Sequence, residues 1–132
     1  MKTKPYLTLA DVKKIAAACE AEALKNKWNV AIVILDDGGH PLWLQRLDGA
    51  TPANAEIALQ KARTAALSRR TSKSWEDRIT GGRLAMLAMP LLPIQGGVPI
   101  TYQGEFVGAI GVSGVQSFED EQIATAGANA LN

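Results

Sequence analysis

The sequence predicts a protein that contains both helices and strands (α/β in the broad sense). Its arrangement is α+β, with helices that flank an antiparallel sheet. Four stretches have the apolar, β-branched character of strands, and tight turns join them as two pairs: 30–35 with 41–47, and 98–102 with 105–113. Tight turns connect antiparallel neighbours, whereas parallel strands need long crossovers. Helix-like stretches precede, separate and follow the two pairs, which argues against a doubly wound fold.

Composition sets limits on the class of protein. With 132 residues, the chain suits a single domain, 1–132, built around one core. Its 47% hydrophobic and 20% charged residues exclude a disordered chain. A net charge of +1 gives no indication that the protein binds nucleic acid or an anionic membrane. A lone cysteine, no signal-peptide pattern and no long apolar run lead us to expect a soluble, cytoplasmic protein.

The first helix is predicted from its start signal and its periodicity. Thr8 and Asp11 are spaced as in a capping box, in which a hydroxyl and a carboxylate satisfy first-turn amides. The apolar residues then recur at helical spacing: Leu9, Val12, Ile15, Ala16, Cys19 and Ala23. Because Cys19 lies on this stripe, we expect a buried, inert thiol.

The first strand pair follows. Residues 30–35, VAIVIL, are continuously apolar and predict a central strand. The Asp-Asp-Gly-Gly run at 36–39 predicts a turn, and 41–47 returns as the antiparallel partner, with Trp43 and Leu47 on one face.

The middle of the chain predicts two helices and an irregular segment. Thr51-Pro52 supplies a cap and a first-turn proline, and the helix 53–70 carries a narrow alanine stripe for close packing. Thr71 is expected to cap a short helix, 72–80. Two prolines interrupt 83–94, so we predict a short helical turn that leads into an edge strand.

The second strand pair, within residues 96–114, is the predicted centre of the fold. Gln103-Gly104 is a two-residue hairpin signal. Strict alternation over 105–113 places Phe106, Ile110 and Val112 on one face and mostly small residues on the other: Val107, Ala109, Gly111 and Ser113. A face of small side chains allows a helix, a second subunit or a flat ligand to approach the backbone closely. The last helix is expected to begin near Ser117, with a capping pattern that ends at Asp120.

Familiar catalytic motifs are missing. The sequence has no CxxC and no Walker A pattern, and its GxxGxxG run, 108–114, lacks the surrounding βαβ unit of a dinucleotide site. A single histidine, His40, excludes two-histidine metal motifs. Two interpretations of His40 stay open: an exposed turn residue, or a ligand to a metal or haem iron.

Charged residues offer a second set of candidates. The helix 53–70 and its extension carry a basic run: Lys61, Arg63, Arg69, Arg70 and Lys73. The run is either a solvated face or a site for carboxylate or propionate groups, because an arginine fork matches a carboxylate. We interpret Asp36 and Asp120 as structural groups near turns or caps, and Ser113 as a packed residue without an evident base.

Five segments together resemble the GlcG/HbpS family, once labelled a domain of unknown function. They are VILDDGG at 33–39, RLD at 46–48, KARTAA at 61–66, GGVPI at 96–100, and VGAIGVSG at 107–114 with Asp120-Glu121 following. The resemblance covers essentially the whole chain. The stretch ARTAALSRRT and the DDGGH turn are most similar to the GlcG branch, whose members are encoded beside glycolate-oxidation genes.

The resemblance implies a profilin-like fold with a five-stranded antiparallel sheet. It also implies homo-oligomers, built from dimers into larger rings or octamers. Some relatives bind haem, some are secreted redox-linked haem sensors, and some are fused to cobalamin adenosyltransferases. For this chain, the resemblance implies haem as cofactor and His40 as a candidate ligand to its iron.

The sequence therefore leaves three functions open for this protein. The first is a non-catalytic binding protein with an inter-subunit pocket for haem or another small molecule near the Gly96-Gly97 loop. Its expected ligand-binding residues are Lys61, Arg63, Thr64, Gly96, Gly97, Pro99, Ser113 and Asp120. The second is an enzyme or enzyme accessory acting on a small carboxylic acid such as glycolate, with Arg63 or Lys61 binding the carboxylate and Asp120 or His40 transferring a proton. The third is a structural oligomer without catalysis.

Overall fold

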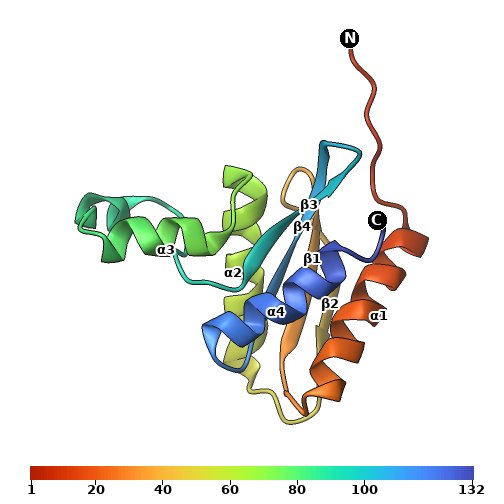
Figure 1. The fold of residues 1–132 in the computed structure, drawn as a ribbon, viewed down its shortest axis with the longest axis horizontal. Helices are drawn as coiled ribbons and strands as arrows, with labels where there is room; N and C mark the ends of the chain where they lie inside the picture. Colours follow the sequence, from red (N-terminus) through yellow and green to blue (C-terminus); the bar gives the residue numbers. More distant parts are fainter.

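The structure, a computed structural model, describes residues 1–132 as one four-stranded sheet with helices on both faces (Figure 1). In chain order, the elements are α1 (Leu9–Lys25), β1 (Ala31–Asp36), β2 (Pro41–Arg46), α2 (Pro52–Ser68), α3 (Ser72–Thr80), a 3-10 helix (Leu84–Ala88), β3 (Gly97–Tyr102), β4 (Glu105–Ser113) and α4 (Ser117–Ala128). The strand order is β2-β1-β4-β3, and every neighbouring pair is antiparallel. No helix combines the length and apolar character that a membrane span requires.

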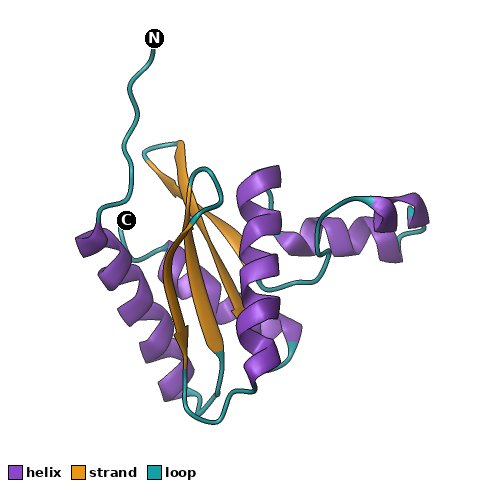
Figure 2. Ribbon diagram, turned by 180° about the vertical axis from the view of Figure 1, so that it is seen from behind, coloured by secondary structure: helices purple, strands orange, loops and turns teal.

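The helices form two layers around the sheet. Helices α1 and α4 cover one face and α2 covers the other, whereas α3 and the 3-10 helix project away from the sheet (Figure 2). The antiparallel α+β architecture is therefore confirmed, with β4 as a central strand between β1 and β3.

The sheet has four strands, so the expectation of five is wrong. Residues 83–94, which were expected to form a helical turn that leads into an edge strand, contain the 3-10 helix but no strand, and β3 is itself the edge. Pro90 and Pro93 explain the difference, because each removes a backbone donor that a ladder would use. The profilin-like assignment stays a prediction.

The two sides of the sheet have different cores. Valine and isoleucine side chains of the sheet pack against α1 and α4, together with Cys19 of α1. Burial raises the pKa of the Cys19 thiol to about 12, so the thiol stays protonated at neutral pH, as its position on the apolar stripe predicts. On the other side, four alanines of α2 are fully buried against the sheet: Ala58, Ala62, Ala65 and Ala66.

Glycine allows α2 to lie directly on the sheet backbone. Gly97 and Gly111 are opposite each other in the β3–β4 ladder. A Cβ atom at Gly111 would lie 2.0 Å from the Ala58 carbonyl oxygen, and one at Gly97 would lie 2.1 Å from that of Lys61. The predicted close approach to the small-residue face is confirmed, and the element that makes it is α2.

A β-bulge corrects the predicted faces of β4. Gly108 pairs with Ile100 and Phe106 pairs with Thr101, which leaves Val107 without a partner in the ladder. The extra residue reverses the alternation on its N-terminal side. Val107 consequently packs in the core under α1 and α4, and Phe106 packs against the alanine cluster of α2, the reverse of the prediction for these two residues.

Turns and caps hold the ends of the elements. Thr8 and Asp11 form the predicted capping box of α1. In the β1–β2 turn, Asp36 Oδ1 accepts hydrogen bonds of 2.9 Å from the amides of both Gly38 and His40, which confirms Asp36 as a structural residue. The cap of α4 differs from the prediction, because Gln116 and Glu119 form its capping box.

Candidate functional site

Most of the predicted site residues lie in one buried polar cluster around Lys61 and Asp120. The Lys61 Nζ atom of α2 lies 3.0 Å from Asp120 Oδ2 at the start of α4, and it also donates to the Val112 carbonyl oxygen at 3.1 Å. Lys61 is 2% exposed and Asp120 1% exposed. Two opposite charges are therefore held together away from solvent, where an unpaired charge would be costly.

The cap of α4 explains the orientation of Asp120. Because Gln116 and Glu119 satisfy the first-turn amides, the Asp120 carboxylate is left to point inward, where Oδ1 accepts from the Val115 amide at 3.1 Å. Burial raises the pKa of the Asp120 carboxyl above its ordinary value, while the Lys61 ammonium and the Val115 amide oppose that shift.

Glycine also makes room for the lysine. Gly96 has a φ of +136°, and a Cβ atom there would lie 2.8 Å from Lys61 Nζ and 2.7 Å from the Val112 carbonyl oxygen. Any side chain would displace the ammonium group and strain the backbone. Gly96 is thus required by the ion pair as well as by the turn into β3.

Three hydroxyl groups extend the cluster. Ser72 Oγ accepts from the Gly97 amide at 2.8 Å, and Thr64 Oγ1 accepts from the Leu92 amide at 2.9 Å. Ser113 Oγ donates to Asn54 Oδ1 at 3.2 Å. The cluster, which comprises Lys61, Thr64, Ser72, Gly96, Gly97, Ser113 and Asp120, ties α2, α3 and α4 to the sheet, and its polar atoms bond to groups of this chain.

The exposed candidates lie outside that cluster. Arg63 projects from α2 into solvent and makes no hydrogen bond or ion pair within the chain, while Pro99 is half-buried on the edge strand β3. His40 is exposed on the β1–β2 turn, and its backbone is fixed by Asp36. The structure therefore separates the predicted residues into a buried set and an exposed set.

The surroundings of His40 include a residue that the sequence did not single out. Leu67 of α2 is 55% exposed and lies against Gly39, next to His40 in the turn. Arg63 is four residues before Leu67 and so shares its helix face. Arg69 donates to the Asp37 carbonyl oxygen at 2.8 Å, with its guanidinium 3.8 Å from the centre of the Phe106 ring. We name His40, Arg63, Leu67 and Arg69 the His40 surface.

Few side chains of the chain are placed to bind a metal ion, a haem or a small molecule. No three His, Cys, Asp or Glu side chains gather as they would around a metal ion. A single exposed imidazole suits one axial position of a haem iron instead. A cavity of about 430 Å³ lies elsewhere, between α1, the end of α4 and the β3–β4 hairpin, and none of the predicted site residues lines it.

Comparison with known proteins gives consistent results. The family model described as "Haem degrading protein HbpS-like" matches residues 7–129. The chain is 47% identical to Protein GlcG of Escherichia coli (strain K12) over 114 residues, 86% of this chain and 85% of the relative. It is 35% identical to an uncharacterized 15.0 kDa protein from the dhaT-dhaS intergenic region of Citrobacter freundii, over 89% of this chain and 87% of the relative.

Solved structures share the fold along nearly the whole chain. A double mutant of Streptomyces reticuli HbpS has a TM-score of 0.88 and 32% identity, covering 100% of this chain and 91% of that one. Klebsiella pneumoniae protein ORFY has a TM-score of 0.89 and 26% identity, covering 98% and 93%. A PduOC:Heme complex shares the fold at a TM-score of 0.86 and 24% identity, covering 97% and 96%. The match over residues 7–129 and the identity to GlcG show that this chain belongs to the HbpS-like family.

Proposed function

We propose that this protein is a non-catalytic haem-binding protein and that His40 is an axial ligand of the haem iron. The observation that carries the proposal is the His40 surface, where the sole imidazole of the chain is exposed on a turn fixed by Asp36. The family description, "Haem degrading protein HbpS-like", names haem and so supports the ligand, while degradation of haem is an activity that the proposal does not assign to this chain.

The residues of the His40 surface fit three parts of a haem. The His40 imidazole suits the iron, the exposed Leu67 side chain suits the apolar ring, and the unpaired guanidinium of Arg63 suits a propionate. When bound, haem supplies an iron centre that can exchange electrons and ligands. The chain itself binds and orients the group.

The buried polar cluster has a supporting role in this proposal. By fixing α2 against the sheet, Lys61 and Asp120 fix the positions of Arg63 and Leu67 on the outer face of the same helix. The other buried members of the predicted set act in the same way: Thr64, Gly96, Gly97 and Ser113. Pro99, on the edge strand, is proposed to face a second subunit of a dimer-based homo-oligomer, up to an octamer, which covers the exposed side of the haem.

Titration with haem tests this function. We expect a saturable Soret band in the wild-type protein and, in His40→Ala, a shifted band with an affinity weaker by about tenfold or more. Arg63→Leu should weaken binding with no change in the position of the band, because it removes a propionate partner but no iron ligand. Lys13→Met, which removes an exposed positive charge on α1, is the matched control and should bind as the wild type does. An absent band, or an identical titration for His40→Ala, rejects the proposal.

A second ligand class is favoured by the unpaired guanidinium of Arg63. A small carboxylic acid such as glycolate matches that group, because a guanidinium fork pairs with a carboxylate. In a thermal-shift screen, stabilisation by 2-hydroxy acids that is lost in Arg63→Leu and kept in His40→Ala would identify this function. Stabilisation by haem alone would exclude it.

A further inference from the structure

The cavity of about 430 Å³ is created by the different lengths of the sheet and its helices. The β3–β4 hairpin extends past the start of α1 and the end of α4, so the helices leave part of that sheet face uncovered (Figure 1). Its volume falls within the range of about 300–1,000 Å³ that small-molecule sites occupy. The space lies within one chain and is distinct from the His40 surface.

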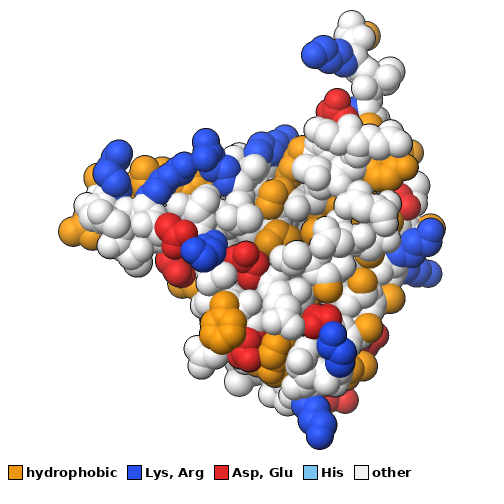
Figure 3. Space-filling view, viewed as in Figure 1, with side chains coloured by type: hydrophobic (Ala, Val, Ile, Leu, Met, Phe, Trp, Pro, Cys, Tyr) orange, Lys and Arg blue, Asp and Glu red, His pale blue; other side chains and the backbone are white.

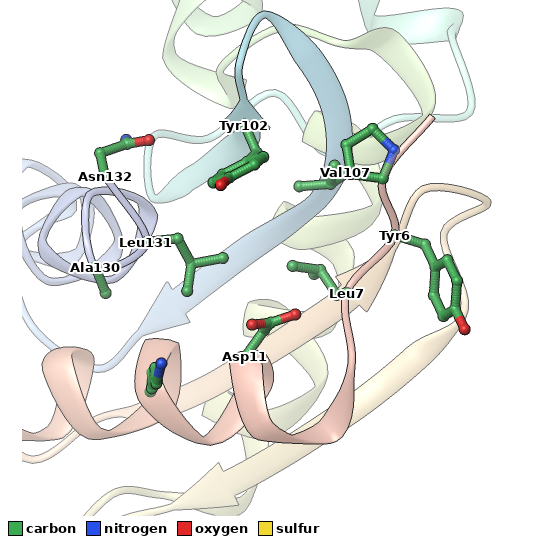
Figure 4. A pocket seen from close by; sticks show the side chains of 10 residues that line it. Tyr6, Leu7, Asp11, Tyr102, Val107, Ala130, Leu131 and Asn132 are labelled. Carbon is green, nitrogen blue, oxygen red and sulfur yellow. The ribbon is translucent and has the colours of Figure 1, made fainter. Parts of the chain in front are cut away.

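Polar and apolar groups contribute about equally to the walls of the cavity, and the apolar groups form its base. Leu7 and Val107 are core residues at its base, and Tyr102 and Leu131 are partly buried beside them. Figure 4 shows Tyr102, Leu131 and Asp11 converging on the same space from the sheet, the end of α4 and α1, while the ring of Tyr6 points away. The cavity thus offers an apolar floor under an aromatic ring.

Two opposite charges lie at one side of the cavity, three residues apart on α1. Asp11 Oδ2 is occupied by the amide and hydroxyl of Thr8, both at 2.9 Å, whereas Oδ1 has no partner in the chain. The ammonium group of Lys14 makes no hydrogen bond or ion pair. Residues three apart on a helix are surface neighbours, about 5–6 Å apart at Cβ. A carboxylate and an ammonium therefore face one cavity without being bonded to each other.

We propose that this cavity binds a zwitterionic amino acid with an apolar or aromatic side chain. The ammonium of the ligand pairs with Asp11 Oδ1, its carboxylate pairs with Lys14, and its side chain lies over Leu7, Val107 and Tyr102. The two charges of an α-amino acid sit on one carbon, which matches adjacent groups of opposite sign on one helix face. A ligand with only one charge would leave the other protein group unpaired, and a ligand without a side chain would leave the apolar walls exposed to water.

Four probes separate these requirements in an NMR titration of the ¹⁵N-labelled full chain. L-phenylalanine carries both charges, N-acetylphenylalanine only the negative one, phenylalanine amide only the positive one, and glycine has no side chain. We expect saturable shifts of amides in the β3–β4 hairpin and in residues 129–131 with phenylalanine. The other three probes should bind more weakly by about tenfold or more.

Variants then locate the charges. Lys14→Met keeps the aliphatic stem of an exposed residue and should weaken phenylalanine binding by about tenfold or more without loss of folding. Asp11→Asn should have a similar effect, and Lys13→Met, on the next exposed position, should have none. The proposal is overturned if phenylalanine produces no saturable shift, if N-acetylphenylalanine binds equally well, or if Lys14→Met binds like the wild type. None of these results bears on haem binding at His40.

Discussion

At the scale of single residues, the buried Lys61–Asp120 pair has the largest predicted energetic consequence. Each ion has given up its hydration, so each depends on the other and on the Val112 and Val115 backbone groups. Asp120→Ala should lower the free energy of unfolding by about 3–5 kcal/mol, because it leaves the Lys61 ammonium buried and unpaired. Urea denaturation followed by circular dichroism measures this change.

The exposed Lys73–Asp77 pair on α3 is the matched control for that prediction. Its Nζ–Oδ2 distance of 2.6 Å is shorter than that of the buried pair, but its side chains are 45% and 56% exposed. Asp77→Ala should therefore change stability little, since solvent screens the interaction. If Asp120→Ala is as stable as Asp77→Ala, the buried pair does not hold α2 and α4 in place.

The sequence predicted single residues well where the reason was local. Asp36 ends an apolar run and begins an Asp-Asp-Gly-Gly sequence, so its role in the turn could be inferred from its neighbours. Cys19 could be placed on a buried stripe from spacing alone. The partner of Lys61 could not be inferred in this way, because Asp120 is 59 residues away and the two meet only when α2 and α4 pack on the sheet.

At the scale of elements, the contact between α2 and the sheet depends on Gly111. An alanine Cβ there would lie 2.0 Å from the Ala58 carbonyl oxygen and 2.6 Å from the Ala62 nitrogen, so the helix would have to move. Gly111→Ala should lower the free energy of unfolding by about 1–3 kcal/mol or more, the typical cost of overpacking. Thermal and urea unfolding provide the measurement.

Gly81→Ala serves as its comparison. Gly81 has an ordinary φ of −78° at the exposed end of α3, and an added Cβ would lie 3.0 Å from the Asp77 carbonyl oxygen and 3.6 Å from that of Arg78. This variant should be close to wild type in stability. A Gly111→Ala protein with the same stability would mean that α2 is not seated on the backbone of β4.

The elements themselves were largely predictable, because helix caps, hairpin turns and apolar periodicity each depend on residues that are close together in the sequence. The bulge in β4 was not, since the run EFVGAIGVS alternates equally well with or without one unpaired residue. The fifth strand is missing for a different reason. Residues 91–94 are apolar enough for a strand, but the prolines at 90 and 93 lack the backbone N–H groups that pairing with a neighbouring strand requires.

At the scale of the whole molecule, the segment formed by α3 and the 3-10 helix projects from the core and exposes large apolar side chains. Leu84 and Leu87 are 65% and 63% exposed there, and Figure 3 shows Lys and Arg side chains along one edge of the projection. We expect an oligomer in which this segment is an interface. Replacing both leucines with glutamate, L84E together with L87E, should shift the mass measured by light scattering to a smaller species while the circular dichroism spectrum is kept.

The control for that shift is Leu24→Glu, because Leu24 is 62% exposed on α1, away from the projecting segment. It should leave the mass unchanged. A wild-type protein that is monomeric at micromolar concentration, or an L84E and L87E protein with wild-type mass, would show that the projection is not the interface. The sequence predicted an irregular apolar segment here, but only the three-dimensional arrangement shows that it stands apart from the core.

The claim that haem binds through His40 is tested most directly by restoring the lost ligand. Free imidazole added to haem-loaded His40→Ala should return the Soret band to its wild-type position, because the small molecule fills the space that the side chain vacated. The same addition to the wild-type protein, where His40 already fills that position, gives the baseline for imidazole that binds at the second axial position. A band in His40→Ala that already matches the wild type, or one that imidazole does not move, would contradict the assignment of His40 as the ligand of the iron.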